Sequence, residues 1–230
     1  MNIVLATRNV DKVREISAIL STITVELSGL ERFGDVPEVV EDGDTLEHNA
    51  IKKAQEVLGH TGWCALADDT GLEVDALDGA PGVYSSRYAG DGATYEDNCV
   101  KLIGALDGVP ESERTARFRC KMALALTDDA GSTVKVRMAE AGQNVRPNTT
   151  GDGGMVLVTE GIIEGRITQA PRGRDGFGYD PVFEVTSCGQ TLAEMGPDEK
   201  NQISHRYRAL VELRELLLRW GFAREKGSTS

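Results

Sequence analysis

Apolar side chains recur along the chain in two patterns, which predict an alternation of strands and helices. Short continuous or alternating apolar runs predict strands at residues 3–6, 23–27, 63–67, 72–77, 116–126, 134–138 and 155–163. Apolar residues three or four positions apart predict helices at 12–20, 45–58, 94–106 and 204–220. Strands that alternate with helices are typical of an α/β fold.

The organisation of the chain favours one domain over residues 1–222, since no repeat, low-complexity tract or shift of composition marks a linker. Residues 223–230 are polar, and we expect them to form a disordered tail. No apolar run approaches the ~20 residues that a membrane span requires. The apolar start of the chain is too short for a signal peptide. We therefore expect no membrane partner.

Four scattered cysteines contain no CxxC pair, which favours reduced thiols over a disulfide framework or a zinc site and predicts a cytoplasmic protein. They are Cys64, Cys99, Cys120 and Cys188. Asp and Glu number 37 against 25 Lys and Arg, and the formal net charge is −12. This balance argues against a nucleic-acid partner, because polyanions attract basic surfaces. A phosphate site would need a local reversal of charge.

A polar turn between the first predicted strand and helix carries Thr7, Arg8, Asn9 and Lys12. Free backbone N–H groups at a helix start, together with a lysine, form a cradle for an anion. The same residues also suit an ordinary capped turn, because the segment is no Walker A motif.

Acidic side chains follow the apolar run 63–67 at Asp68 and Asp69, where we expect the strand to end in a turn. Ligands in open α/β sheets bind at strand ends. Successive side chains of a strand point to opposite faces, so only one of the two carboxylates is expected to bind a given ion. A second acidic cluster, 41–44, precedes the helix at 45–58 and suits either Mg²⁺ ligation or helix capping by Asp44 with Glu47.

Two later segments offer binding groups. The loop 174–181 interleaves glycines with Phe177 and Tyr179, and these aromatic rings suit either stacking on a base or anchoring of the loop. His205 and Arg206 begin the last predicted helix, where cations oppose the helix dipole, and Lys200 precedes them. They are expected either to bind a ligand or to pair with local carboxylates.

Six segments in this order resemble the inosine triphosphate pyrophosphatase family, the non-canonical purine nucleoside triphosphate pyrophosphatases. They are Ala6-Thr7-Arg8-Asn9 with Lys12; Glu41-Asp42-Gly43 and Asn49-Ala50 with Lys53-Ala54; Ala67-Asp68-Asp69-Thr70-Gly71-Leu72; 79–88; 176–181; and Lys200 with 203–206. The resemblance covers nearly the whole chain.

The resemblance implies a long, twisted mixed sheet flanked by helices, in two lobes with an active-site cleft between them, and a homodimer. It also implies Mg²⁺-dependent hydrolysis of inosine, xanthosine and deoxyinosine triphosphates to the monophosphate and pyrophosphate.

Roles for individual residues follow from the same resemblance. Glu41 and Asp69 would bind the metal, and Asp69 would also accept a proton, with Lys53 and Asp68 in support. The residues implied to bind the substrate are Thr7, Arg8, Asn9, Lys12, Thr70, Phe177, Gly178, Tyr179, Asp180, Lys200, His205 and Arg206.

This chain departs from the family pattern at 144–154, which resembles an inserted loop, and at Tyr207, where a small residue is common. Two other functions stay open. One is a pyrophosphatase for modified pyrimidine nucleotides. The other is a nucleotide-binding regulator without catalysis, against which the retained Asp69, Glu41 and Lys53 argue.

Overall fold

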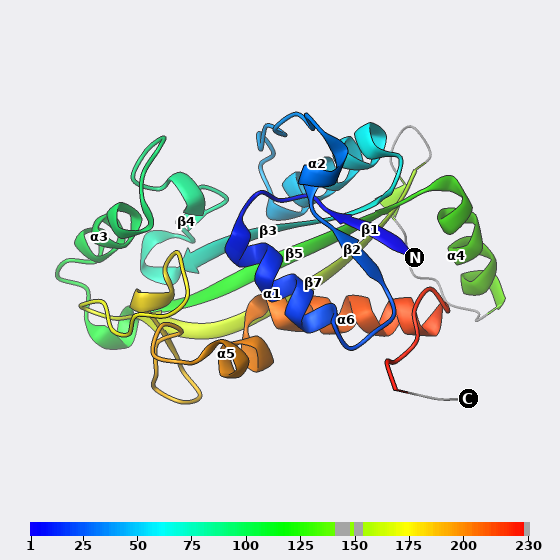
Figure 1. Cartoon of the computed structure of the whole chain (residues 1–230). Coiled ribbons are helices and arrows are strands. Elements are labelled where there is room, and N and C mark those ends of the chain that lie inside the picture. The colour runs from blue at the N-terminus through cyan, green and yellow to red at the C-terminus, as the bar shows by residue number, and fades with distance from the viewer. Residues whose placement is uncertain (141–147, 150–153, 228–230) are drawn as a thin grey trace. The chain divides into compact units, whose positions relative to one another are not determined.

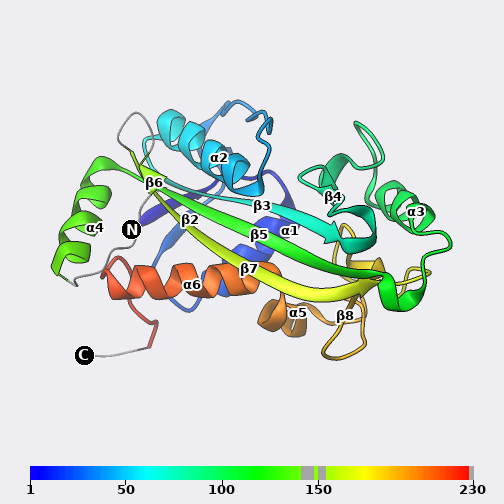
Figure 2. The same ribbon diagram turned by 180° about the vertical axis from the view of Figure 1, so that it is seen from behind.

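The computed structural model, shown in Figures 1 and 2, describes residues 1–140, 148–149 and 154–227. Its strands are β1 (Asn2–Leu5), β2 (Glu26–Ser28), β3 (Cys64–Val74), β4 (Pro81–Gly82), β5 (Thr115–Leu126), β6 (Asn148–Thr149), β7 (Met155–Ile167) and β8 (Phe183–Val185). Its helices are α1 (Val10–Leu20), α2 (Leu46–Thr61), α3 (Tyr95–Ala105), α4 (Asp128–Glu140), α5 (Pro197–Ile203) and α6 (His205–Arg219).

The strands form one mixed sheet with the order β2-β1-β3-β5-β7-β6, in which β4 also pairs with β3 and β8 with β7. Strand β1 runs parallel to both β2 and β3. The pairs β3–β4, β6–β7 and β7–β8 are antiparallel. The predicted α/β fold with a long mixed sheet flanked by helices is therefore confirmed, whereas the cleft between two lobes stays a prediction.

The chain divides into two compact units, each with its own apolar core. Unit 1 comprises Met1–Asp69, Lys121–Glu160 and Ala209–Ser230, and unit 2 comprises Thr70–Cys120 and Gly161–Arg208. In unit 1, residues of α2 pack on β1, β3 and β5 in a cluster rich in alanine and valine. In unit 2, Leu102 of α3 and Phe118 of β5 belong to a cluster with the segment that follows β7. The prediction of a single domain over 1–222 stays a prediction.

Helices lie on both faces of the strands of unit 1, with α2 on one face of β1 and β3 and α1 on the other (Figures 1 and 2). Ala50 and Ala54 of α2 share their cluster with Ala65 and Ala67 of β3. Odd-numbered residues of β3 therefore face α2, and even-numbered ones face away from it, because strand side chains alternate.

Several predicted elements are confirmed, among them the helices at α1, α2, α3 and α6 and the strand at β5. Strong periodicity explains these successes, since Thr94 caps α3 and one face of β5 is buried throughout. The predicted cap of α2 is wrong by one residue. Thr45, rather than Asp44, accepts the hydrogen bond from the His48 N–H at 3.1 Å.

The strand predicted at 134–138 is wrong, because these residues lie in α4. Val134 is buried and Val136 is 59% exposed. Residues two positions apart point to different sides of a helix, whereas they share a face of a strand. Ala130 and Val134 lie four residues apart and continue the helical pattern instead. The periodicity of one short valine-rich run could not distinguish the two structures.

The turn predicted at 68–71 is also wrong, since β3 continues without interruption from Cys64 to Val74. Acidic residues and a glycine suggested a break. The strand tolerates Asp68 and Asp69 because each carboxylate has a lysine partner within unit 1. The pair nevertheless lies beyond the end of β1, whose last residue, Leu5, aligns with Leu66.

Two predicted segments fall partly outside the described residues, namely the loop at 144–154 and the tail at 223–230. In the described part of the tail, Glu225 forms an antiparallel bridge with Ile23. Across residues 1–140, 148–149 and 154–227, no helix has both the length and the apolar character to cross a bilayer.

Candidate active site

The turn between β1 and α1 is organised by its own polar side chains. The Thr7 hydroxyl oxygen accepts a hydrogen bond from the Asn9 N–H at 3.1 Å. Asn9 Oδ1 accepts from the N–H groups of Asp11 and Lys12 at 3.0 and 3.2 Å and so caps α1. The prediction of free N–H groups is therefore wrong for these two amides, while the lysine side chain stays a candidate anion donor.

Lys12 forms an ion pair with Asp68, with 3.0 Å between Nζ and Oδ2. The Asp68 side chain is fully buried and that of Lys12 is 19% exposed. Arg8, two residues before α1 begins, donates to the backbone oxygen of Val36. The ammonium of Lys12 thus neutralises a carboxylate that water cannot reach.

Lys53 of α2 lies among the carboxylates on the other face of β3. Its Nζ is 2.7 Å from Glu41 Oε1 and 3.7 Å from Asp69 Oδ1. It also donates to the backbone oxygen of Asp68 at 2.6 Å. Asn49, one turn earlier on α2, donates from Nδ2 to Asp69 Oδ2 at 3.1 Å. Glu41 and Asp69 therefore converge on one cation.

The opposite orientation of Asp68 and Asp69 is confirmed. Asp69 has the parity of Ala65 and Ala67, which pack on α2, so it meets Lys53 there. Asp68 points to the other face and meets Lys12 of α1. Two successive positions of β3 therefore place one buried carboxylate on each of its faces in unit 1.

Burial and charge shift the pKa values of this group. Burial by itself would lower the pKa of Lys53, but the carboxylates of Asp69, Asp68 and Glu41 outweigh it and raise that pKa. Burial raises the pKa of Asp69, the nearby Glu41 carboxylate adds to the increase, and Lys53 and Lys12 oppose it. The raised pKa makes Asp69 a stronger proton acceptor than an exposed aspartate.

The donor chemistry of Glu41 and Asp69 suits a hard cation. Among the described residues, no group of three or more His, Cys, Asp or Glu side chains is arranged to hold a metal. Mg²⁺ needs fewer protein ligands, because it is commonly held by one or two carboxylates with water and phosphate oxygens. Two carboxylates that already converge on the ammonium of Lys53 fit that requirement.

A second cluster of predicted residues lies in unit 2, around a buried ion pair. Lys200 Nζ is 2.6 Å from Asp180 Oδ2, and both side chains are at most 5% exposed. The same oxygen accepts a hydrogen bond from the Phe177 N–H at 2.8 Å. At Gly176, with φ of +76°, a Cβ would lie 2.1 Å from that oxygen, so only glycine fits this turn.

The ring of Phe177 is half-buried and lies beside cations and a second aromatic ring. Lys200 Nζ is 4.6 Å from the ring centroid, and Arg206 Cζ is 5.6 Å from it. The Tyr95 ring lies 5.9 Å away in a tilted arrangement. Arg206 also donates to the Thr70 hydroxyl oxygen at 3.4 Å. Unit 2 therefore combines an aromatic surface with two hydrogen-bond donors.

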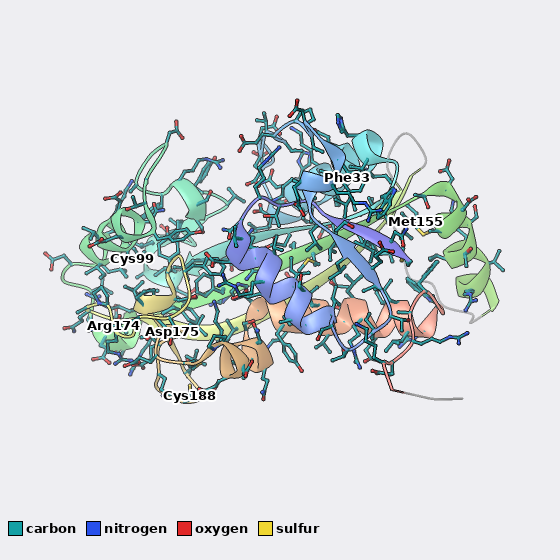
Figure 3. All side chains as sticks on the ribbon, in the orientation of Figure 1. Phe33, Cys99, Met155, Arg174, Asp175 and Cys188 are labelled. Carbon is teal, nitrogen blue, oxygen red and sulfur yellow. The ribbon has the colours of Figure 1, made fainter. Side chains whose placement is uncertain are left out.

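The other two aromatic candidates belong to the core of unit 2. The Tyr179 side chain is buried, and its hydroxyl donates to the Ser85 carbonyl oxygen at 2.8 Å. His205 stacks on Phe118 with 4.7 Å between ring centroids. Cys99 of α3 donates to the carbonyl oxygen of Gly178, in the loop that also carries Arg174 and Asp175 (Figure 3). Tyr179 therefore anchors the loop in the core, whereas the half-buried ring of Phe177 is partly accessible.

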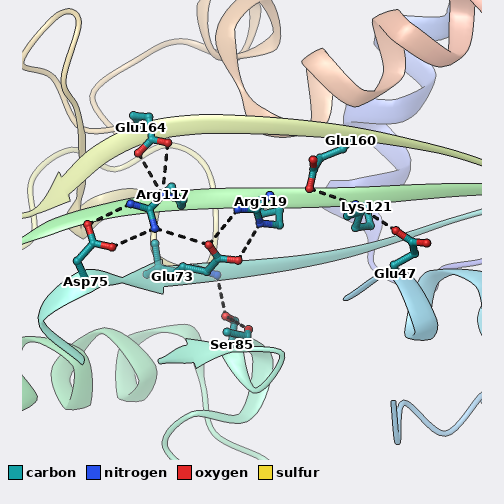
Figure 4. Close-up of polar contacts among 11 residues, drawn as sticks. Glu47, Glu73, Asp75, Ser85, Arg117, Arg119, Lys121, Glu160 and Glu164 are labelled. Carbon is teal, nitrogen blue, oxygen red and sulfur yellow. Dashed lines mark hydrogen bonds and ion pairs between the residues drawn. The ribbon is translucent and has the colours of Figure 1, made fainter. Parts of the chain in front are cut away.

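Other basic side chains form ion pairs with carboxylates outside the predicted site residues (Figure 4). In unit 2, Arg117 pairs with Asp75 and Glu164, and Arg119 pairs with Glu73. In unit 1, Lys121 lies between carboxylates of Glu47 and Glu160, as the same figure shows. These contacts account for basic residues that sequence reasoning did not assign to a phosphate site.

Sequence reasoning assigned no role to two residues of these clusters, Asn49, which belongs to a segment of the family resemblance, and Tyr95. Asn49 precedes Lys53 by four residues on α2, a spacing that places both on one helical face and could have suggested a shared role. Tyr95 begins α3, far in sequence from Phe177, and no sequence signal joined them.

Comparisons with known proteins show similarity over nearly the whole chain. The model of the Ham1 family matches residues 3–216. A Geobacter sulfurreducens protein named dITP/XTP pyrophosphatase is 46% identical over 215 residues, which cover 94% of this chain and 96% of that protein. A Geobacillus kaustophilus protein of the same name is 44% identical over 93% of this chain and 92% of its own.

Solved structures show the same similarity. A HAM1 protein from Coxiella burnetii has a TM-score of 0.78 and 38% identity, covering 95% of this chain and 98% of that one. A Mycobacterium abscessus structure, titled nucleoside-triphosphatase / dITP/XTP pyrophosphatase, has a TM-score of 0.68 and 37% identity, covering 93% of this chain and 98% of its own.

Proposed function

The chain belongs to the Ham1 family, and we propose that it hydrolyses deoxyinosine, xanthosine and inosine triphosphates to the monophosphate and pyrophosphate. The observation that carries this proposal is the convergence of Glu41, Lys53 and Asp69 in a chain whose relatives bear the name dITP/XTP pyrophosphatase. Such an enzyme would remove non-canonical purine nucleotides from the nucleotide pool.

The cluster of unit 1 supports binding of the phosphates and of a metal. Mg²⁺ held by Glu41 and Asp69 would supply charge neutralisation and a more acidic bound water. Lys12 Nζ would donate to phosphate oxygens together with the Thr7 hydroxyl and the other side chains of the turn, Arg8 and Asn9. Lys53 would hold the two carboxylates in place, and Asp68 would orient Lys12.

The reaction places a proton on Asp69. A water oxygen attacks the α-phosphorus while a carboxylate oxygen of Asp69 accepts a proton from that water. The bond between the α-phosphorus and the oxygen that bridges to the β-phosphate breaks, and this oxygen leaves with pyrophosphate. Phosphoryl transfer depends mainly on such positioning and charge neutralisation.

The cluster of unit 2 supports recognition of the base. Phe177 would stack on the purine ring. Gly178, Tyr179 and Asp180 of the same loop would position Phe177. Lys200 and Arg206 would donate to the 6-keto oxygen of hypoxanthine or xanthine. Adenine presents an amino donor at that position, so it would face these donors unfavourably. Contacts from Thr70 and His205 complete the proposed set of substrate residues.

Two further features belong to the proposal. A homodimer follows from the family resemblance, and sedimentation equilibrium of the purified chain tests it. A cytoplasmic location follows from the cysteine pattern, and fractionation of cells tests it.

A pyrophosphate-release assay over a panel of nucleotides tests the proposed function. We expect release from deoxyinosine and xanthosine triphosphates with Mg²⁺, little from ATP, and none after chelation of the metal. Release from modified pyrimidine triphosphates alone would indicate the second enzymatic function. Tight binding without release would indicate a regulator. The Asp69→Asn variant should lose activity, and a fully active variant would contradict the assigned role.

A further inference from the structure

Asn49 joins the two acidic segments of unit 1 through its side-chain amide. Its Oδ1 accepts a hydrogen bond from the Gly43 N–H at 2.8 Å, and its Nδ2 donates to Asp69 Oδ2 at 3.1 Å. The residue is 1% exposed. Gly43 lies two residues after Glu41, so one buried amide contacts both the loop of Glu41 and the carboxylate of Asp69.

These two contacts require a side chain that both accepts and donates, as the amide of Asn49 does. A backbone N–H can only donate and a carboxylate can only accept, so the side chain must accept on one atom and donate on another. An ionised aspartate could not donate, and alanine or leucine could do neither. The partners also fix which amide atom is the oxygen.

The loop approaches Asn49 closely because Gly43 has no side chain. A Cβ at Gly43 would lie 2.7 Å from Asn49 Oδ1 and 2.9 Å from the His48 ring. The backbone of Asn49 is held in the first turn of α2, where its N–H donates to the Thr45 carbonyl oxygen at 3.1 Å. The loop therefore rests on a rigid helical support.

The hydrogen bond to Asp69 also selects the orientation of its carboxylate. Asn49 takes Oδ2, and Oδ1 faces the ammonium of Lys53, which Glu41 also contacts. The side chain of Asn49 thus fixes the rotation of the Asp69 carboxylate and the position of the loop that carries Glu41. Hydrogen bonds of this kind orient metal-binding carboxylates and tune metal affinity.

We propose that Asn49 is a positioning residue that sets the arrangement of Glu41 and Asp69 and thereby the affinity of the site for a divalent cation. The inference rests on the proposed function, because it assigns those two carboxylates to the metal. Asn49 would act through these two carboxylates.

The chain offers a matched control in Asn98 of α3. This residue is 2% exposed, its Oδ1 accepts from the Ala89 N–H at 2.7 Å, and its Nδ2 donates to the Ser86 carbonyl oxygen at 3.2 Å. It holds a loop on a helix as Asn49 does, but it contacts no carboxylate in these bonds. Asn49→Ala and Asn98→Ala are therefore expected to lose similar stability for different functional results.

The test measures metal affinity directly. Mn²⁺ is titrated into the whole chain with an inosine triphosphate analogue that carries a methylene bridge between its α- and β-phosphorus atoms, and free Mn²⁺ is followed by electron paramagnetic resonance. We expect the dissociation constant to rise about 10–100-fold in Asn49→Ala and to stay unchanged in Asn98→Ala. The Mg²⁺ concentration for half-maximal activity should shift in the same way.

A second pair of variants acts from the loop. Gly43→Ala should weaken Mn²⁺ binding in the same direction, because the added methyl group pushes the loop away from Asn49. Gly59 of α2 has open space around its Cβ position, so Gly59→Ala should leave binding unchanged. This pair keeps the test valid even where Asn49→Ala does not fold.

Hydrogen exchange of the metal-free protein separates this inference from the proposed function. The Gly43 amide should exchange faster in Asn49→Ala than in Asn98→Ala. Weaker Mn²⁺ binding in a chain that releases no pyrophosphate would retain the role of Asn49 and remove the proposed reaction. Folded Asn49→Ala and Gly43→Ala variants that bind Mn²⁺ as tightly as the active, unsubstituted enzyme would overturn the inference.

Discussion

Breaking the ion pair between Asp180 and Lys200 by removing one partner is expected to destabilise unit 2 and the loop that carries Phe177. Its side chains are 4% and 5% exposed, and Nζ lies 2.6 Å from Oδ2. Removing one partner of such a pair leaves an uncompensated buried charge and costs about 3–5 kcal/mol. For a chain of this size, that loss lowers the melting temperature by about 10 °C.

The perturbation is a double-mutant cycle with Asp180→Asn, Lys200→Met and the combined variant. Asparagine keeps an acceptor for the Phe177 N–H, so Asp180→Asn removes chiefly the charge. The combined variant buries no charge at these positions and should recover most of the loss. Urea unfolding followed by circular dichroism should give a coupling energy of about 2 kcal/mol or more.

An exposed pair provides the control for this cycle. Arg14 and Asp11 lie 3.5 Å apart on α1, with side chains 72% and 39% exposed. Arg14→Met should change stability by less than about 1 kcal/mol, because solvent screens such pairs. Additive effects of Asp180→Asn and Lys200→Met would refute the reasoning, since they would mean that the two charges do not depend on each other.

Three other predictions concern base selection, pH and thiol reactivity. Arg206→Ala should reduce the preference for inosine over adenosine triphosphate. An unchanged ratio of the two kcat/KM values would contradict the role of Arg206 in base selection. Burial would raise the pKa of Glu184, but hydrogen bonds from two arginines outweigh it and lower that pKa. Its stabilisation is therefore present above the unfolded pKa of about 4.5 and is lost as the pH falls further. Glu184→Gln should be less stable at pH 7 and should lose less stability on acidification; equal losses in urea titrations at both pH values would contradict this. Burial, followed by the Asp180 charge, raises the pKa of Cys99 to about 11. Iodoacetamide at pH 8 should therefore modify the exposed Cys188 first, which peptide mass spectrometry checks, and faster labelling of Cys99 would be inconsistent with its burial.

The elements that sequence reasoning predicted are those with a long, one-sided pattern. In β5, alternate residues from Ala116 onward are buried, and α3 begins at the capping residue Thr94. The failures are local patterns that tertiary contacts decide. Val134 and Val136 suited a strand but lie in α4, and β3 continues through Asp69 because a lysine neutralises it there.

The candidate site was predicted unevenly for the same reason. Asp69 stood out in the sequence, as an acidic residue beside an apolar run. Lys53 did not, because an isolated lysine is usually on the surface, and only the family resemblance assigned it a role. Asn49 received no role because its contacts join a loop and a strand that meet only after folding.

The acidic character of the chain is compatible with a phosphate substrate for a structural reason. Arg117 and Arg119 form ion pairs with carboxylates of unit 2. Lys12 and Lys53 instead lie beside the buried Asp68 and Asp69 of the candidate site. The net charge of −12 therefore argues against polymeric phosphates but not against a nucleotide.

The most direct test of the central claim is product analysis after hydrolysis of deoxyinosine triphosphate in ¹⁸O-labelled water with Mg²⁺. The proposed reaction yields the monophosphate and pyrophosphate in equal amounts, with the label in the monophosphate, because water attacks the α-phosphorus. Mass spectrometry of both products measures this. Release of single phosphate groups, or label found in pyrophosphate, would contradict the account.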